Sequence, residues 1–103
     1  MPASAAEKIA VENVIRPGTW RRVDARMYGA MRRAMLRVLP AAPPGITLAE
    51  LRDRLLPTLP ATLYPGGAKA GWWLKTVQLD LEAKGIVART KSSPLRVYRG
   101  DER

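Results

Sequence analysis

The chain has 103 residues, enough for one domain with a modest hydrophobic core. Its 18 Lys and Arg residues outnumber nine Asp and Glu residues, and the formal net charge of +9 attracts polyanions, nucleic acid first among them. Cys and His are both absent, which excludes disulfides, thiol and histidine chemistry and the usual zinc ligands, so we expect neither a metal nor a cofactor.

The sequence carries no signal for a membrane. Its apolar runs are shorter than the roughly 18 residues that a membrane-spanning helix needs. The segment that begins at Met1 has no basic stretch followed by an apolar one, the pattern of a secretory signal. We therefore expect a cytoplasmic protein that does not bind membranes.

Residues 1–22 are predicted to form an N-terminal arm. Residues 7–14 favour a short helical turn, which Pro17 and Gly18 would end. The arm has recurring apolar side chains, which are Ile9, Val11, Val14, Ile15 and Trp20. Part of the arm is therefore expected to lie on the domain surface or on a second subunit.

A first helix is predicted from Asp24, an N-cap residue, to Pro40. Its apolar positions have helical spacing, and its arginines lie between them: Met27, Met31, Ala34, Met35 and Val38, with Arg26, Arg32, Arg33 and Arg37. A rigid turn follows over residues 40–45.

A second, short helix begins after Thr47. Glu50 stands three residues later, as in a capping box, and the helix must end before Pro57. A loop then leads to Gly67 and carries apolar anchors at Leu59, Leu63 and Tyr64.

The third helix is predicted over residues 69–84, with Gly85 as its left-handed cap. One stripe faces the core, flanked by Trp73, and consists of Ala70, Leu74, Val77 and Leu81. The opposite side gathers Lys69, Trp72, Thr76, Leu79 and Ala83, with Lys75 and Asp80 on the margins.

Two runs of strand-forming residues, 86–90 and 95–99, predict a β-hairpin, to whose edge Ile46 could add a short strand. The resulting order predicts an α+β fold of the winged helix-turn-helix class, with three helices followed by a β-hairpin wing. The arm would span residues 1–22, the domain 23–100 and a tail 101–103.

The phrase VQLDLEAKGIVART…PLRVYR resembles the winged-helix pattern in which a recognition helix leads into the wing. From Val11 to Arg99 the chain resembles a family of small uncharacterised bacterial proteins that carry VEN, PG and PGGAKAGWW…KTVQLDLEAKG. This resemblance implies the winged-helix fold and a bacterial origin, and it implies no activity.

We expect a DNA-binding, transcription-regulator-like protein that acts as a homodimer, because each subunit offers one reading helix. The helix near 69–84 would read duplex DNA, while a basic wing near 86–99 would contact phosphates or the minor groove. The expected contacts are Lys69, Lys75, Thr76, Arg89, Lys91, Ser92, Arg96 and Arg99, with Gln78 a weaker candidate near the core stripe. Asp80 and Glu82 oppose this hypothesis, since carboxylates repel phosphate.

Several alternatives remain open. The arginines could simply cover solvated faces. Trp72 could be covered by the arm or by the loop before the third helix, could pack in a homodimer, or could contact nucleic acid. With Leu79 it could instead anchor a protein-protein interaction module that has no nucleic-acid role.

An enzyme is not expected, because the carboxylates of Asp24, Glu50 and Asp53 are explained by helix starts and solvated faces. The segment YPGGAKAG lacks the Gly-Lys-Ser/Thr ending of a phosphate-binding loop and follows no strand.

Overall fold

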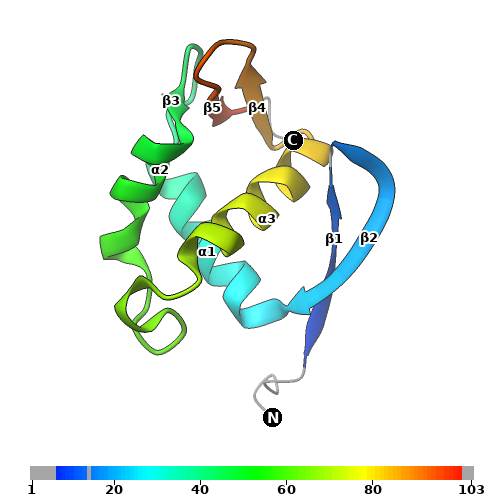
Figure 1. The fold of residues 1–103 in the computed structure, drawn as a ribbon, viewed down its shortest axis with the longest axis vertical. Helices are drawn as coiled ribbons and strands as arrows, with labels where there is room; N and C mark the ends of the chain where they lie inside the picture. Colours follow the sequence, from blue (N-terminus) through cyan, green and yellow to red (C-terminus); the bar gives the residue numbers. More distant parts are fainter. Residues whose placement is uncertain (1–6, 14, 101–103) are drawn as a thin grey trace.

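A computed structural model describes residues 7–13 and 15–100. These residues form an α+β fold with three α-helices and two small antiparallel sheets (Figure 1). The helices and strands are β1 (Lys8–Asn13), β2 (Arg16–Asp24), α1 (Ala25–Val38), β3 (Ile46–Thr47), α2 (Leu48–Leu55), α3 (Ala70–Ala83), β4 (Val87–Thr90) and β5 (Arg96–Arg99). Single 3₁₀ turns cover Leu56–Thr58 and Pro65–Gly67.

The N-terminal segment is a β-hairpin, so the predicted helical turn over residues 7–14 is wrong. β1 pairs antiparallel with β2, and Val11 lies opposite Arg21. In β1, Ile9 and Val11 are two residues apart and share one side of the strand, while Lys8, Ala10 and Glu12 share the other. Val11 and Val23 are each only 5% exposed. The rest of the predicted arm and tail, residues 1–6, 14 and 101–103, lies outside the described part of the chain.

The predicted helix starts are confirmed. The Asp24 carboxylate accepts the backbone N–H groups of Arg26 and Met27, at 2.9 and 3.1 Å, at the start of α1. Thr47 and Glu50 form the reciprocal capping box of α2. Each cap satisfies amides that lack a partner within the helix and thereby fixes where the helix begins.

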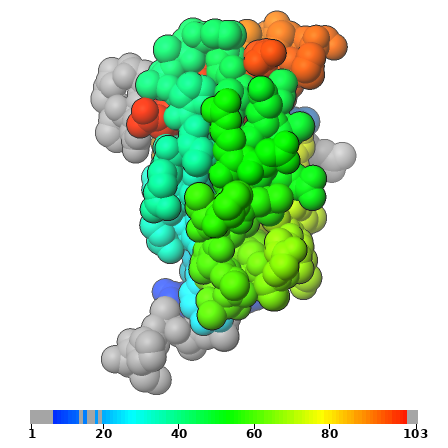
Figure 2. Space-filling model, turned by 90° about the vertical axis from the view of Figure 1, so that its left-hand side faces the viewer, coloured from blue at the N-terminus to red at the C-terminus, as the bar shows by residue number. Residues whose placement is uncertain are grey.

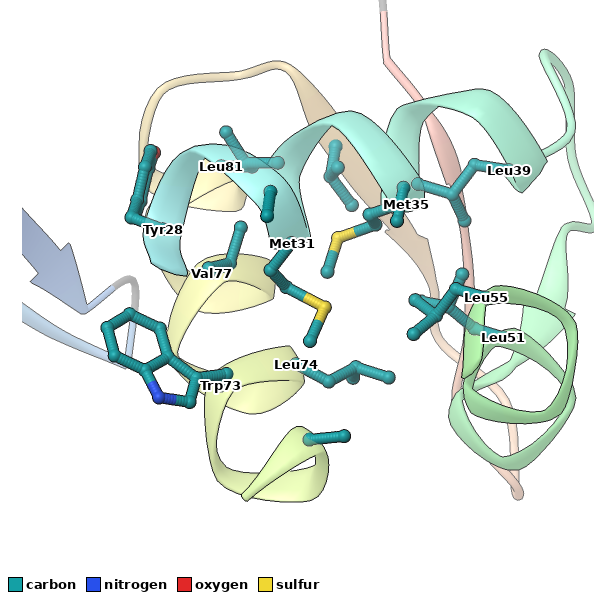
Figure 3. Close-up of a cluster of buried hydrophobic side chains, with 14 of the residues drawn as sticks. Tyr28, Met31, Met35, Leu39, Leu51, Leu55, Trp73, Leu74, Val77 and Leu81 are labelled. Atoms are coloured by element: carbon teal, nitrogen blue, oxygen red, sulfur yellow. The ribbon is translucent and has the colours of Figure 1, made fainter. Parts of the chain in front are cut away.

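The core lies between the three helices (Figure 3). It is built from the apolar faces that the periodicity predicts, and its central members are fully or almost fully buried: Met31 and Met35 from α1, Leu51 and Leu55 from α2, and Leu74, Val77 and Leu81 from α3. Trp73 and Tyr28 extend this core toward the β1–β2 hairpin (Figure 3).

The second sheet has the order β3-β5-β4, which confirms both the predicted hairpin and the edge strand at Ile46. Gly45, just before β3, has φ +84°. A Cβ at this position would lie 2.2 Å from the carbonyl oxygen of Val97, so only glycine lets β3 approach β5 this closely.

Candidate functional site

The adjacent tryptophans of α3 have different surroundings. Trp73 is 6% exposed and belongs to the core, as predicted, whereas Trp72 is 46% exposed. The two rings meet edge to face with their centroids 5.1 Å apart. Trp73 therefore supports the position of Trp72 at the surface.

The first half of α3 presents a polar and aromatic surface around Trp72. Lys69 and Lys75 are exposed and Thr76 is half-buried. Lys69 precedes the helix in a left-handed conformation with φ 65°. The structure thus brings together three of the predicted nucleic-acid contacts on α3.

The second half of the same face is covered. Leu79 is only 7% exposed, so its predicted exposure beside Trp72 is wrong. The β1–β2 hairpin lies along this side of α3 (Figure 1), and Val11 and Asn13 stand beside Leu79 along one groove. One of the stated alternatives was that the arm covers Trp72; the hairpin that the arm forms covers Leu79 instead and leaves Trp72 46% exposed.

Asp80 is fully buried, although the helical geometry placed it on the margin of the outward face. Its carboxylate accepts hydrogen bonds from the backbone N–H of Glu12, at 2.9 Å, from the Tyr28 hydroxyl and from the Lys84 ammonium. Burial, and then the hydrogen bond to Asp80, raise the pKa of Tyr28. Asp80 thereby links α3 to β1 and α1.

Glu82 is also occupied. Its carboxylate accepts two hydrogen bonds from the Arg89 guanidinium, at 2.6 and 2.8 Å, and a third from the Gln78 amide. The hydrogen bond to Glu82 raises the pKa of Arg89. Gln78 is fully buried, in agreement with its predicted place near the core stripe.

The predicted contacts on the β4–β5 hairpin divide into two groups. Lys91, Ser92 and Arg99 are exposed. Arg96 is half-buried and donates to the carbonyl of Gly45, at 3.3 Å, with Glu50 3.7 Å away. Arg89 and Arg96 therefore hold the hairpin to α3 and to the β3 region, whereas Lys91, Ser92 and Arg99 face solvent.

The start of α3 and the loop of the β4–β5 hairpin lie at different levels of the molecule. The loop of the β4–β5 hairpin is at the top, whereas α3 begins near the middle (Figure 1). On the side shown in Figure 2, α2 and the loop after it occupy the centre below this hairpin. The predicted contacts in the hairpin loop are therefore apart from those at the start of α3, whereas Arg89 of the same hairpin is paired with Glu82 of α3.

A groove of about 340 Å³ lies beside the contact between the β1–β2 hairpin and α3 and is lined by residues of both. The Arg21 guanidinium lies 5.9 Å from the centroid of the Trp72 ring. Trp20 is 58% exposed. The groove is lined by Val11, Glu12, Asn13, Trp20, Arg21, Trp72, Lys75, Thr76 and Leu79.

Trp20 and Arg21 were not among the predicted site residues. The signal that could have found them is the pair of β-branched residues Ile9 and Val11 followed by the turn residues Pro17 and Gly18, which together favour a hairpin.

Among residues 7–13 and 15–100, no three acidic side chains gather closely enough to form a candidate metal site. None of the helices in this part of the chain has the length and apolar character required to cross a bilayer.

The model of one protein family, described as a family of unknown function (DUF6958), matches residues 8–97. Neither the curated proteins nor the solved structures contain a significant match to the chain.

Proposed function

Because the chain belongs to the DUF6958 family, whose function is unknown, we propose its function from the geometry of α3: a winged helix-turn-helix protein that binds duplex DNA in a transcription-regulator-like role. The proposal includes a bacterial cytoplasmic setting and a dimer with two reading helices.

The winged-helix assignment is supported by the order of the elements. A short strand lies between α1 and α2, and a hairpin follows α3. The short strand pairs with the second strand of that hairpin. This order supports the proposal that the β4–β5 hairpin is a wing and α3 a recognition helix.

One observation carries the DNA proposal: both carboxylates on α3 are withdrawn from the surface that would meet DNA. Asp80 is buried under the β1–β2 hairpin, and Glu82 is paired with Arg89. What remains exposed on the first half of α3 is Lys69, Trp72 and Lys75, with Thr76 at the edge. The main electrostatic objection to phosphate binding is thereby weakened.

The residues take different roles in this proposal. Lys75 and Thr76 approach base edges or phosphates in the major groove, and Lys69 binds a phosphate near the start of α3. Lys91, Ser92 and Arg99 bind backbone phosphates through the wing. Arg89 and Arg96 position the wing and contribute less to direct binding.

A second candidate function, docking of a protein partner or a second copy, is favoured by the exposure of large apolar side chains. Ile15, Trp20 and Trp72 are 61%, 58% and 46% exposed. Leu79, the other anchor predicted for such an interface, is covered by the hairpin and is not part of this surface.

Fluorescence anisotropy of labelled duplex DNA at two salt concentrations tests the DNA proposal. About four phosphate contacts in each subunit, eight in the proposed dimer, would give a logarithmic salt slope of about −7. Lys75→Ala, which removes one contact from each subunit, should weaken binding and flatten this slope by about two, whereas Arg54→Ala, which removes an exposed cation from α2, should leave both unchanged. Absence of binding at low salt would refute the proposal, and light scattering of Trp72→Ala then examines the docking alternative.

A further inference from the structure

The groove between the β1–β2 hairpin and α3 has two aromatic walls. Trp72 reaches it from the first half of α3, with its ring supported by the buried Trp73. Trp20 reaches it from β2 and exposes more than half of its surface. Two indoles at the rim of one groove offer flat apolar faces on which a planar ring can stack.

The same groove carries positive charge. Arg21 lies over the Trp72 ring, and Lys75 follows Trp72 by one helical turn. The acidic lining residue, Glu12, has its carboxylate 3.3 Å from the backbone N–H of Gly18, which donates to it. Two cations beside two stacking surfaces suit a ligand that combines a flat ring with an anionic group.

The dimensions favour a small unit over a double helix. A volume of about 340 Å³ is at the lower end of the range for pockets that hold small molecules. A duplex hides the faces of its bases by stacking, so the indoles of this groove have access only to a base that has left the stack.

We propose that this groove binds one unpaired nucleotide of a DNA strand, with the base stacked against Trp20 and Trp72 and the phosphate held by Arg21 and Lys75. The inference rests on the proposed DNA-binding function for its duplex part and adds a substrate class to it. The protein then binds a duplex that ends in, or is interrupted by, a single-stranded segment more tightly than a blunt duplex.

The test compares a blunt duplex with the same duplex carrying a short thymidine overhang, measured by anisotropy at one salt concentration. Stacking of one base is expected to raise affinity by roughly 5- to 150-fold. The intrinsic tryptophan fluorescence should be quenched at the same time. Trp20→Ala should bring the affinity for the overhang duplex down to that of the blunt duplex.

Ile15→Ala provides the matched control. It also removes an exposed apolar side chain from the β1–β2 hairpin, but Ile15 is not among the residues that line the groove. This variant should keep the preference for the overhang.

The outcomes separate the inference from the proposed function. Equal binding of the blunt and overhang duplexes overturns the groove assignment and leaves duplex binding intact. Binding of the overhang strand without binding of the blunt duplex supports the groove and refutes the duplex proposal. The groove assignment is overturned if the Trp20→Ala variant keeps the preference for the overhang. It is also overturned if Trp20→Ala dissociates a dimer and has no effect on overhang binding.

Discussion

The Asp80 carboxylate of α3 accepts the backbone N–H of Glu12 on β1 at 2.9 Å, and through this contact the N-terminal hairpin is attached to the helical core. The same buried carboxylate holds the Tyr28 hydroxyl and the Lys84 ammonium. A fully buried charge is tolerated only where hydrogen bonds and an opposite charge compensate it. Asp80 is therefore a structural residue, and its partners lie on β1, on α1 and at the C-terminal cap of α3.

Asp80→Ala should lower the free energy of unfolding by about 3 to 5 kcal/mol, because it leaves the Tyr28 hydroxyl and the Glu12 N–H without their acceptor. Urea denaturation measures the effect. Asp53→Ala removes an exposed carboxylate from α2 and should change stability by less than about 0.5 kcal/mol. Equal effects of the two substitutions would contradict the role given to Asp80.

Gly45 and Gly18 offer a second comparison, since both have a positive φ, +84° and +87°. Alanine at Gly18 meets nothing within 4 Å and should cost only the backbone strain, about 1 to 2 kcal/mol. Alanine at Gly45 collides with the carbonyl of Val97 and should cost clearly more, because β3 must move away from β5. Thermal denaturation of the two variants compares them, and equal losses would show that the close approach at Gly45 is not needed.

The helices were predictable because their signals are local. Asp24 and Thr47 cap helices through residues two or three positions away, and the core stripe of α3 follows from its spacing alone. The burial of Leu79 and Asp80 was not predictable from α3, because it depends on β1, which lies far away in the sequence. The angular position of a residue around the helix gives the side on which it lies, but it does not give which distant segment of the chain packs on that side.

The candidate site was predictable to a similar extent. Lys69, Trp72 and Lys75 are exposed on α3 as their positions indicate. Arg89 was expected to contact phosphate, yet it forms an ion pair with Glu82 across the turn between α3 and β4. The sequence alone does not show which basic residues near a predicted wing form an ion pair within the protein.

Stability should decrease at alkaline pH because two tyrosines are buried. Burial raises the pKa of Tyr28 and of Tyr64 above the ordinary value of 10.0. The hydrogen bond to Asp80 raises the pKa of Tyr28 further, and the negative charge of Asp24 raises that of Tyr64 further. Below pH 10.0 both tyrosines are protonated in the folded and the unfolded chain, and their stabilising contribution is complete. Above it the unfolded chain loses these protons first, so the free energy of unfolding falls as pH rises.

The double variant Tyr28→Phe/Tyr64→Phe isolates this effect. It is less stable at neutral pH, since the hydroxyls bonded to Asp80 and to the Met27 carbonyl are lost. Its free energy of unfolding should nevertheless fall less steeply above pH 10.0 than that of the wild type. Chemical denaturation across a pH series gives both slopes, and parallel curves would argue against the tyrosines as the cause.

Arg89 and Lys91 are both cations of the β4–β5 hairpin, but their substitution should affect different quantities: stability for Arg89 and DNA affinity for Lys91. Arg89→Ala leaves the Glu82 carboxylate, whose side chain is 5% exposed, without its bidentate partner, and should lower the free energy of unfolding by about 1 to 3 kcal/mol. Lys91 is exposed, so Lys91→Ala should leave stability unchanged and weaken DNA binding with a smaller salt slope. Denaturation and anisotropy on the same two proteins measure both quantities. The contrary outcome is that Arg89→Ala is as stable as the wild type and loses more DNA affinity than Lys91→Ala does. Arg89 would then be a phosphate contact whose guanidinium must leave Glu82 before it binds DNA.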